Sequence, residues 1–230
     1  MKSNWELTKS NSNYHFDSRR VDGPQQVVQF LGHITPTWSA DLENIVTDAK
    51  PATWATRGYK TEHSVVPSAE LEKEEYDLVA SGMGRDLPIT HFNWQIPASL
   101  QRISDSFALA DCMNRIHVQR PGEMWNLHID KLFKWFPDNP ERVMRISIQL
   151  TDWQPGQFWE YGNYHHNQWL AGEVTAFDWQ NLPHCTANAG YHPRVTFQIT
   201  GIKTPATDKF LNTLNTKQLK HISQTNKKYK

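Results

Sequence analysis

Polar and aliphatic residues alternate strictly along two stretches in the second half of the chain. In Arg145–Leu150 every second residue is polar and the residues between are isoleucine or leucine, and Arg194–Thr200 repeats the pattern with valine, phenylalanine and isoleucine. Because successive side chains of a β-strand point to opposite faces, this period of two predicts two strands. Each strand is expected to have one apolar and one polar face.

Helical spacing of apolar residues appears before these strands. We expect a helix over Ser39–Asp48, capped by Ser39 and with acidic residues in its first turn. A second helix is expected to start at Ser68, with Leu71, Leu78 and Val79 on one face. A third is predicted after Pro97, and its apolar stripe consists of Leu100, Ile103, Phe107 and Ala110.

The two ends of the chain are less clearly patterned. Met1–Pro24 is polar and predicts an irregular lead, and Val27–Leu31 is a short apolar run that predicts a strand. After Pro205 we expect a helix capped by Thr207, whose apolar face includes Leu211, Leu214, Leu219 and Ile222. The basic tail beyond it is expected to be a solvated end, with a dimerising or substrate-covering helix as the alternative.

Composition narrows the function classes. The chain has 230 residues, with 24 basic and 24 acidic side chains and therefore no net charge. Such a balance gives no general attraction to nucleic acid or to an anionic membrane. The chain has no apolar run of membrane-spanning length, no secretory signal and only two cysteines, so we expect a cytoplasmic protein. We expect it to form a single domain that is monomeric or homodimeric through the C-terminal helix. Ten tryptophans are expected to be mostly core residues.

A possible metal site follows Pro121. His128 and Asp130 are two residues apart, so on a strand they would share one face. His184 follows much later in the chain and supplies a second imidazole. Two histidines and one carboxylate form the facial triad that suits non-haem Fe(II). We therefore predict that His128, Asp130 and His184 are the metal ligands and catalytic residues.

Two further residues follow the second histidine at a regular distance. Arg194 lies ten residues after His184 and Thr196 two further on, so both would share one strand face. A guanidinium donates two parallel charge-assisted hydrogen bonds to a carboxylate. If these two residues bind a ligand, the polar face of the Arg194–Thr200 strand lines a pocket. The same would hold for Arg145, Ser147 and Gln149, for which a solvent-exposed face is the alternative.

This order of H-x-D, distal His and Arg-x-Thr resembles that of the Fe(II)- and 2-oxoglutarate-dependent oxygenases. The segment WLAGEVTAFDWQNLPH is similar to one in the aspartyl/asparaginyl β-hydroxylase and proline cis-hydroxylase branch, and the resemblance covers about Arg120–Ile202. It implies a mainly β fold with flanking helices, namely a double-stranded β-helix (jelly roll, cupin-like) with helices packed on its larger sheet. The core would span 112–203, supported by 1–111 and followed by a helix and basic tail over 204–230.

The resemblance also implies cofactors and roles. Fe(II) and 2-oxoglutarate would react with O2, releasing succinate and CO2 while a substrate C–H bond is hydroxylated. Arg194 and Thr196 would bind the far carboxylate of 2-oxoglutarate, with Gln149 near it. Arg145 matches the Arg of an R-x-H motif whose His is Ser147 here, and Asn126 is in phase with His128. Arg145 and Asn126 therefore join the candidate cofactor-binding residues.

The nature of the substrate is left open by these residues. The presence of Asp130 resembles the proline cis-hydroxylase and prolyl hydroxylase types and argues against a halogenase, so hydroxylation of an amino acid, free or within a peptide, is favoured. The alternatives are an oxygenase acting on a nucleobase or other small molecule, and a non-catalytic cupin-like metal-binding protein.

Three other residues were weighed as metal ligands. His165 and His166 are rivals to His184, but Arg194 would then lie too far downstream. Cys185 should point away from His184 because adjacent strand residues alternate. None of the three is expected to bind the metal.

Overall fold

The computed structural model describes residues 28–53 and 88–213, apart from residues 129, 131, 133–135, 163, 180 and 181. Within this range the side chains of Thr53, Pro88, Ile89, Asn126 and His128 are not described. The expected polar lead, the helix starting at Ser68 and the C-terminal residues from Leu214 onward lie outside the described residues. No helix in the described part of the chain is long and apolar enough to cross a membrane.

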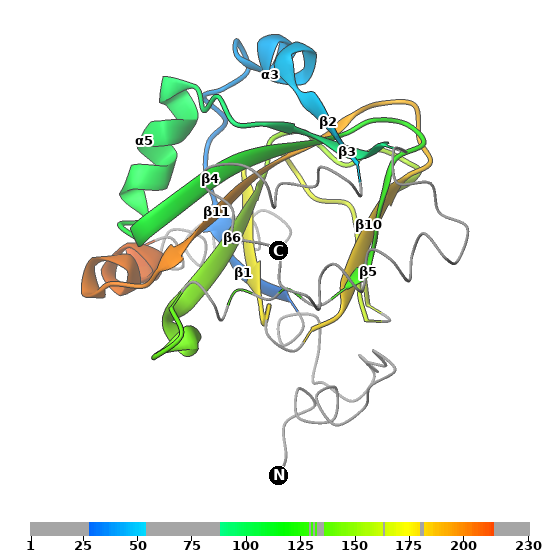
Figure 1. Ribbon diagram of the computed structural model, residues 1–230. Coiled ribbons are helices and arrows are strands. Elements are labelled where there is room, and N and C mark those ends of the chain that lie inside the picture. The colour runs from blue at the N-terminus through cyan, green and yellow to red at the C-terminus, as the bar shows by residue number, and fades with distance from the viewer. Residues whose placement is uncertain are drawn as a thin grey trace, which may run out of the picture.

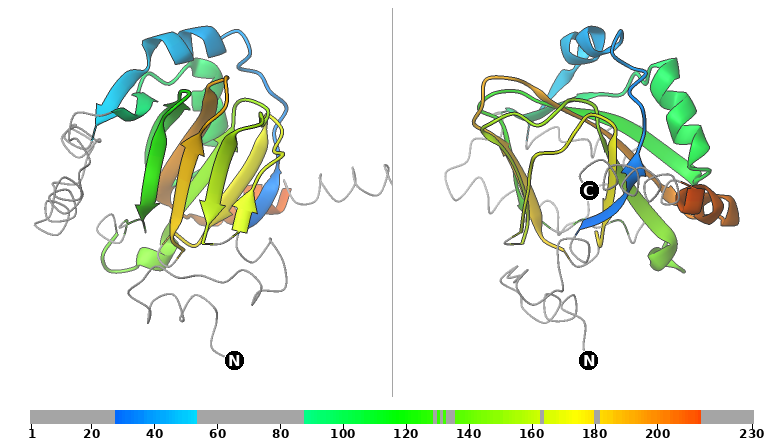
Figure 2. Two further views of the ribbon diagram at one scale, coloured as in Figure 1. Left: turned by 90° about the vertical axis from the view of Figure 1, so that its right-hand side faces the viewer. Right: turned by 180° about the vertical axis from the view of Figure 1, so that it is seen from behind.

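The described strands form two antiparallel sheets. The seven-stranded sheet has the order β1-β9-β6-β11-β4-β3-β2 and the four-stranded sheet the order β5-β10-β7-β8 (Figure 2, left). The larger sheet comprises β1 Val28–His33, β2 Lys50–Thr53, β3 Pro88–Asn93, β4 Ala110–Gln119, β6 Val143–Gln149, β9 Glu173–Phe177 and β11 Arg194–Ile202. The smaller sheet comprises β5 Met124–His128, β7 Gln157–Tyr161, β8 Tyr164–His166 and β10 His184–Asn188.

The connectivity of the last eight strands identifies the fold. From β4 to β11 the chain passes back and forth between the sheets, so that β4, β6, β9 and β11 lie in the larger one and β5, β7, β8 and β10 in the smaller one. The two sheets face each other across an interior (Figure 1). This is a double-stranded β-helix, and the predicted fold class is confirmed.

The outer face of the larger sheet carries the aliphatic core. Alternate residues of β6 and β11 pack there under α3 Leu42–Asp48 and α5 Ala98–Ser106 (Figure 1), together with Trp38, Leu100 and Phe107. Ile146, Ile148, Val195, Phe197 and Ile199 have no exposed surface. The apolar stripe of each strand is thus covered by helices, as the alternation predicted.

Three helix boundaries differ from expectation. The first helix begins at Leu42 with Asp41 as its N-cap residue, because Ser39 lies in a turn before it. The helix after Pro97 ends at Ser106, since Ala108 adopts a φ of 51° that reverses the chain, and Ala110 already belongs to β4.

The helix over 205–213 starts earlier than predicted. Its cap is Thr204, whose Oγ1 accepts the backbone N–H of Thr207 at 3.3 Å, while the Thr207 Oγ1 accepts the backbone N–H of Thr204 at 3.0 Å. Pro205 then occupies the first helical position, where its missing N–H costs nothing. Thr207 is the reciprocal partner in a capping box and not the N-cap.

A close approach of two turns fixes the start of β11. The Ala189 N–H donates to the Gly156 carbonyl at 2.8 Å, and a Cβ on Gly156 would lie 2.6 Å from the Gly190 Cα. The side chain of Asn188 donates to the carbonyls of Gln119 and His192 at 2.9 and 2.8 Å. These contacts hold β10, β4 and the turn before Arg194 in fixed positions.

Candidate active site

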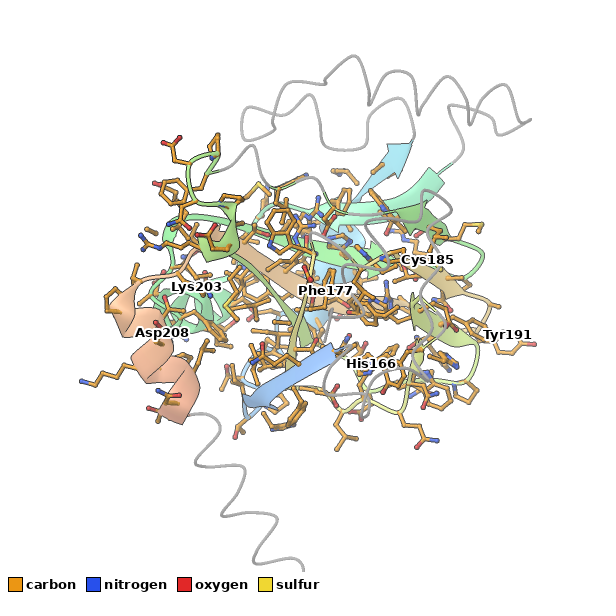
Figure 3. The ribbon with its side chains drawn as sticks, turned by 90° about the horizontal axis from the view of Figure 1, so that it is seen from below. His166, Phe177, Cys185, Tyr191, Lys203 and Asp208 are labelled. Carbon is orange, nitrogen blue, oxygen red and sulfur yellow. The ribbon has the colours of Figure 1, made fainter. Side chains whose placement is uncertain are left out.

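Polar residues of the larger sheet face the smaller sheet. Gln119 on β4 donates to the Thr186 hydroxyl on β10 at 3.0 Å, and Phe177 on β9 lies with its ring 4.7 Å from that of His184 on β10. In Figure 3 Phe177 lies near the middle of the molecule, whereas Tyr191 points outward at its edge. We call the side chains between the two sheets the interior.

The polar faces of β6 and β11 belong to this interior and are not exposed to solvent. Their residues are at most 9% exposed: Arg145, Ser147, Gln149, Arg194, Thr196, Gln198 and Thr200. In the register of the sheet, Thr196 pairs with Gln149, Gln198 with Ser147 and Thr200 with Arg145. The solvent-exposed alternative for these faces is therefore wrong.

His184 is the first residue of β10 and is buried. Its Nδ1 lies 3.1 Å from the carbonyl oxygen of Leu182. A carbonyl only accepts hydrogen bonds, so Nδ1 carries a proton, and a metal ion would be bound through Nε2. Nε2 lies 3.9 Å from Oδ2 of Asp130. The imidazole is thus oriented as a metal-binding histidine commonly is, with the backbone fixing its tautomer.

The position of Asp130 along the chain relative to β5 differs from the prediction. β5 ends at His128, so Asp130 lies beyond the strand and does not alternate with His128 along it. Its Oδ2 accepts a hydrogen bond of 2.6 Å from Nη1 of Arg145, and both side chains are buried. Arg145 is itself held by Thr200, to whose hydroxyl its Nε donates at 3.1 Å. Arg145 therefore contacts a predicted metal ligand.

The third predicted ligand is placed by its backbone. His128 on β5 is directly paired with His184 on β10, and residues paired in this way share a face of the sheet. Its side chain, like that of Asn126, is outside the described set. Among the described side chains no three His, Cys, Asp or Glu residues gather around one point. The triad of His128, Asp130 and His184 remains a prediction.

Arg194 lies at another part of the interior, at the start of β11. It is 3% exposed, and its guanidinium carbon lies 4.6 Å above the ring of Trp159 on β7. Its Nε and Nη1 have no hydrogen-bond partner among the described residues. Burial lowers the pKa of Arg194 to about 10, so that the group is still charged at neutral pH. It is a buried cation whose hydrogen-bonding capacity is partly unused.

Other donors near this end are also unsatisfied. Thr196 donates its hydroxyl to Oε1 of Gln149 at 3.0 Å, while Nε2 of that amide has no partner among the described residues. The hydroxyls of Ser147 and Tyr161 are also buried and have no hydrogen-bond partner among the described residues. The amide nitrogen of Gln149 is a donor only, and each hydroxyl can donate as well as accept, so all three groups can donate to an acceptor.

Several interior residues were not singled out from the sequence. Trp159 and Tyr161 alternate along β7 and face inward, opposite Thr186 and His184 of β10. His117 on β4 pairs with Thr196 and lies 3.3 Å from Oε1 of Gln198. Burial lowers the pKa of His117 well below its ordinary value, and the charges of Arg115, Arg194 and Arg145 lower it further. Alternation in β7 was the available signal for the two aromatic residues.

The rival histidines belong to β8, at the edge of the smaller sheet. His165 stacks on Phe158 with ring centroids 5.4 Å apart, and Nε2 of His166 lies 3.2 Å from a carboxylate oxygen of Glu173. Cys185 is a free cysteine that pairs in register with Glu160, while its neighbour His184 pairs with Tyr161. Neither the rival histidines nor Cys185 joins Asp130 in a described contact.

No model of a protein family matches the chain, and a search among curated proteins finds no match either. Among solved structures, a prolyl-4-hydroxylase from Pseudomonas putida is 16% identical and aligns over 71% of this chain and 99% of its own, with a TM-score of 0.40. A cupin domain from Bordetella pertussis is 15% identical over 53% of this chain and 100% of its own, with a TM-score of 0.33.

A predicted oxalate decarboxylase from Thermotoga maritima is similar at the same distance, with 11% identity over 49% of this chain and 80% of its own and a TM-score of 0.32. Likenesses this remote say nothing about activity. By its strand order the chain is a protein of the cupin-like double-stranded β-helix class.

Proposed function

We propose that this protein is an Fe(II)- and 2-oxoglutarate-dependent dioxygenase that hydroxylates an unactivated C–H bond. The observation that carries the proposal is the state of Arg194, a buried guanidinium with Nε and Nη1 unpartnered among the described residues. A buried charge without a counterion is costly, so an anion is expected to complete the site. A carboxylate fits best because its two oxygens match the planar fork of a guanidinium.

The proposed metal ligands are His128, Asp130 and His184. The donor set fits Fe(II), because it offers imidazole nitrogen and carboxylate oxygen. The hydrogen bond between His184 Nδ1 and the Leu182 carbonyl, the 3.9 Å distance from His184 Nε2 to Asp130 Oδ2 and the pairing of positions 128 and 184 support this assignment. Fe(II) bound there would supply the redox chemistry that couples O2 and 2-oxoglutarate to hydroxylation, with release of succinate and CO2.

The chain's own residues would bind and orient the reactants. Arg194 and the Thr196–Gln149 pair would hold the far carboxylate of 2-oxoglutarate, and Arg145 would keep the Asp130 carboxylate in one orientation. Trp159, Tyr161 and Phe177 are buried beside them and would exclude water from the reacting groups. Charge-assisted hydrogen bonds are stronger in such a site than in water.

The substrate class is proposed on the sequence resemblance alone. An amino acid or a peptidyl residue is favoured, as a small-molecule or peptide substrate of a cytoplasmic enzyme, and no nucleic acid partner is expected from the neutral charge. A panel of amino acids and short peptides should contain members that stimulate succinate formation and gain the mass of one oxygen atom. If only nucleobases or nucleic acid did so, the alternative oxygenase would replace this proposal.

The direct test is succinate formation from 2-oxoglutarate with Fe(II) and O2. Arg194→Met is expected to lower kcat/KM for 2-oxoglutarate by at least about 100-fold, the usual cost of removing one partner of a buried charged pair. Arg142→Met is the matched control, because Arg142 is exposed and donates to the Lys203 carbonyl outside the interior. Asp130→Ala should abolish turnover and weaken Mn(II) binding.

Three results would contradict the proposal. The wild type could bind Fe(II) yet form no succinate with any substrate, which would favour a non-catalytic cupin-like protein. Asp130→Ala could leave turnover unchanged, which would place the metal elsewhere. Arg142→Met could reduce activity as much as Arg194→Met, which would mean that the loss does not arise at the interior guanidinium.

A further inference from the structure

Tyr161 has a buried hydroxyl that the packing of the protein does not explain. It has no exposed surface, and its oxygen has no hydrogen-bond partner among the described residues. A buried hydroxyl without a partner destabilises the folded state relative to a side chain that lacks it. The presence of tyrosine at this position therefore calls for a partner that the described residues do not provide.

The ring of Tyr161, by contrast, packs against three neighbouring rings. It stacks on Trp159 at 5.8 Å with planes 19° apart, and it lies 5.0 Å from the ring of Phe177 and 6.0 Å from that of His184. A phenylalanine would make the same contacts. The hydroxyl is the only part of the side chain that these contacts leave unexplained.

The surroundings of the hydroxyl indicate which chemistry it meets. Arg194 lies over the same Trp159 ring on which Tyr161 stacks, and Tyr161 pairs in register with His184 on β10. The phenol of tyrosine carries an O–H group, so it can donate a hydrogen bond to an acceptor. Tyr161 therefore neighbours both Trp159, which carries Arg194, and the proposed metal ligand His184.

We propose that the Tyr161 hydroxyl is a further ligand-binding donor, which completes with Arg194 and Gln149 a site for an acid that bears a carboxylate at the Arg194 end. This inference rests on the proposed function and extends it, because nothing in the sequence resemblance assigns Tyr161 to the cosubstrate. Arg194 supplies the charge, and Tyr161 and the Gln149 amide supply neutral donors to the remaining oxygen lone pairs. An oxygen-rich anion such as 2-oxoglutarate satisfies all of them, whereas an apolar or cationic ligand satisfies none.

The test uses Tyr161→Phe, with Tyr164→Phe as the matched control. Tyr164 pairs with Tyr161 in the register of β7 and β8, but it is only half-buried and its hydroxyl is not among the buried unsatisfied groups. The full-length protein is loaded with Mn(II), and the dissociation constant for 2-oxoglutarate is measured by calorimetry. A second measurement is the urea midpoint of unfolding of the metal-free proteins.

Tyr161→Phe should weaken 2-oxoglutarate binding and at the same time stabilise the metal-free protein. The dissociation constant should rise about 10- to 100-fold, as expected for the loss of one hydrogen bond to a charged group. The urea midpoint should rise as well, because the variant no longer buries an unpartnered hydroxyl. Tyr164→Phe should change the dissociation constant less than about twofold. A purely structural tyrosine would instead lower the midpoint and leave binding unchanged.

The outcomes separate this inference from the function on which it rests. If the wild type binds 2-oxoglutarate and Tyr161→Phe binds it equally well, the role of Tyr161 is refuted and the proposed function stands. If the wild type with Mn(II) does not bind 2-oxoglutarate, the proposed function fails and this inference fails with it. A lower urea midpoint for Tyr161→Phe would show that the hydroxyl has a partner within the protein and would also overturn the inference.

Discussion

The two faces of the larger sheet are built from the same strands but differ in how completely their atoms are satisfied. Toward the helices, β6 and β11 present isoleucine, valine and phenylalanine side chains with no exposed surface. Toward the interior, the same strands present arginine, serine, threonine and glutamine that are nearly as buried. The apolar face needs nothing beyond close packing, whereas several polar groups of the interior lack a partner among the described residues.

Within the interior, too, some polar groups are hydrogen-bonded and others are not. Arg145 donates to both Asp130 and Thr200, while Nε and Nη1 of Arg194 have no partner among the described residues. Buried polar groups in folded proteins are nearly always hydrogen-bonded, so unsatisfied ones that cluster need an explanation. The contrast teaches that the helix-facing side is completed by packing alone, whereas the Arg194 end of the interior leaves hydrogen-bond donors unpartnered among the described residues, and this is where we propose that a ligand binds.

The largest effect on stability is expected on the helix-facing side. Phe197→Ala should lower the free energy of unfolding by about 3–5 kcal/mol, because it removes a fully buried ring from the core under the helices. Ser147→Ala, on the interior face of the neighbouring strand β6, should change it by less than about 1 kcal/mol, since its buried hydroxyl has no hydrogen-bond partner among the described residues. Urea unfolding of both variants measures the difference, and equal losses would remove the distinction between the faces.

A second prediction concerns the satisfied part of the interior. Arg145→Met should destabilise the metal-free protein by about 3 kcal/mol, because it leaves the buried Asp130 carboxylate without its counterion. With Mn(II) bound the loss should be smaller, since the metal would then offset the charge of Asp130. Urea unfolding with and without Mn(II) tests this, and Arg142→Met should have almost no effect in either condition. An identical loss in both would argue that no metal binds at Asp130.

The strands that carry this contrast were predictable from the sequence because alternation is a local property. The polar and apolar residues of β6 and β11 are assigned to faces by a period of two, and the structure has both strands where the pattern places them. The short apolar run before Leu31 also lies in a strand, β1, although that strand continues to His33.

Other features depended on partners distant in the sequence. The end of β5 at His128 follows from its pairing with β10, so the position of Asp130 outside the strand could not be read from the spacing of the two residues. The contact between Arg145 and Asp130 joins a strand to a loop, and no periodicity predicts it. Tyr161 was missed because alternation along β7 groups it with Trp159 on one face but does not tell which face of β7 turns toward the larger sheet. The helix ends were misplaced because caps such as Thr204 compete locally with equally suitable residues.

A smaller effect on the free energy of unfolding is expected from the titration of His117, because this histidine lies in the interior and not in the helix-facing core. Its ring is buried among the charges of Arg115, Arg194 and Arg145, and burial is the main cause of its lowered pKa. The hydrogen bond to Gln198 acts in the opposite sense but does not outweigh these effects. In the folded protein the ring is therefore neutral, whereas in the unfolded chain it titrates near pH 6.5.

The sign of the pH dependence follows from this difference. Below about pH 6.5 the unfolded state binds one more proton than the folded state, so stability falls as the pH falls, by up to about 1.4 kcal/mol per pH unit. His117→Gln should remove this contribution, so that the variant loses less stability than the wild type between pH 7 and pH 5. Urea unfolding across that range measures it, with His33→Gln as the control because His33 is exposed. Parallel curves for wild type and His117→Gln would mean that the interior tolerates a further positive charge, and the case for an anion-binding interior would be weaker.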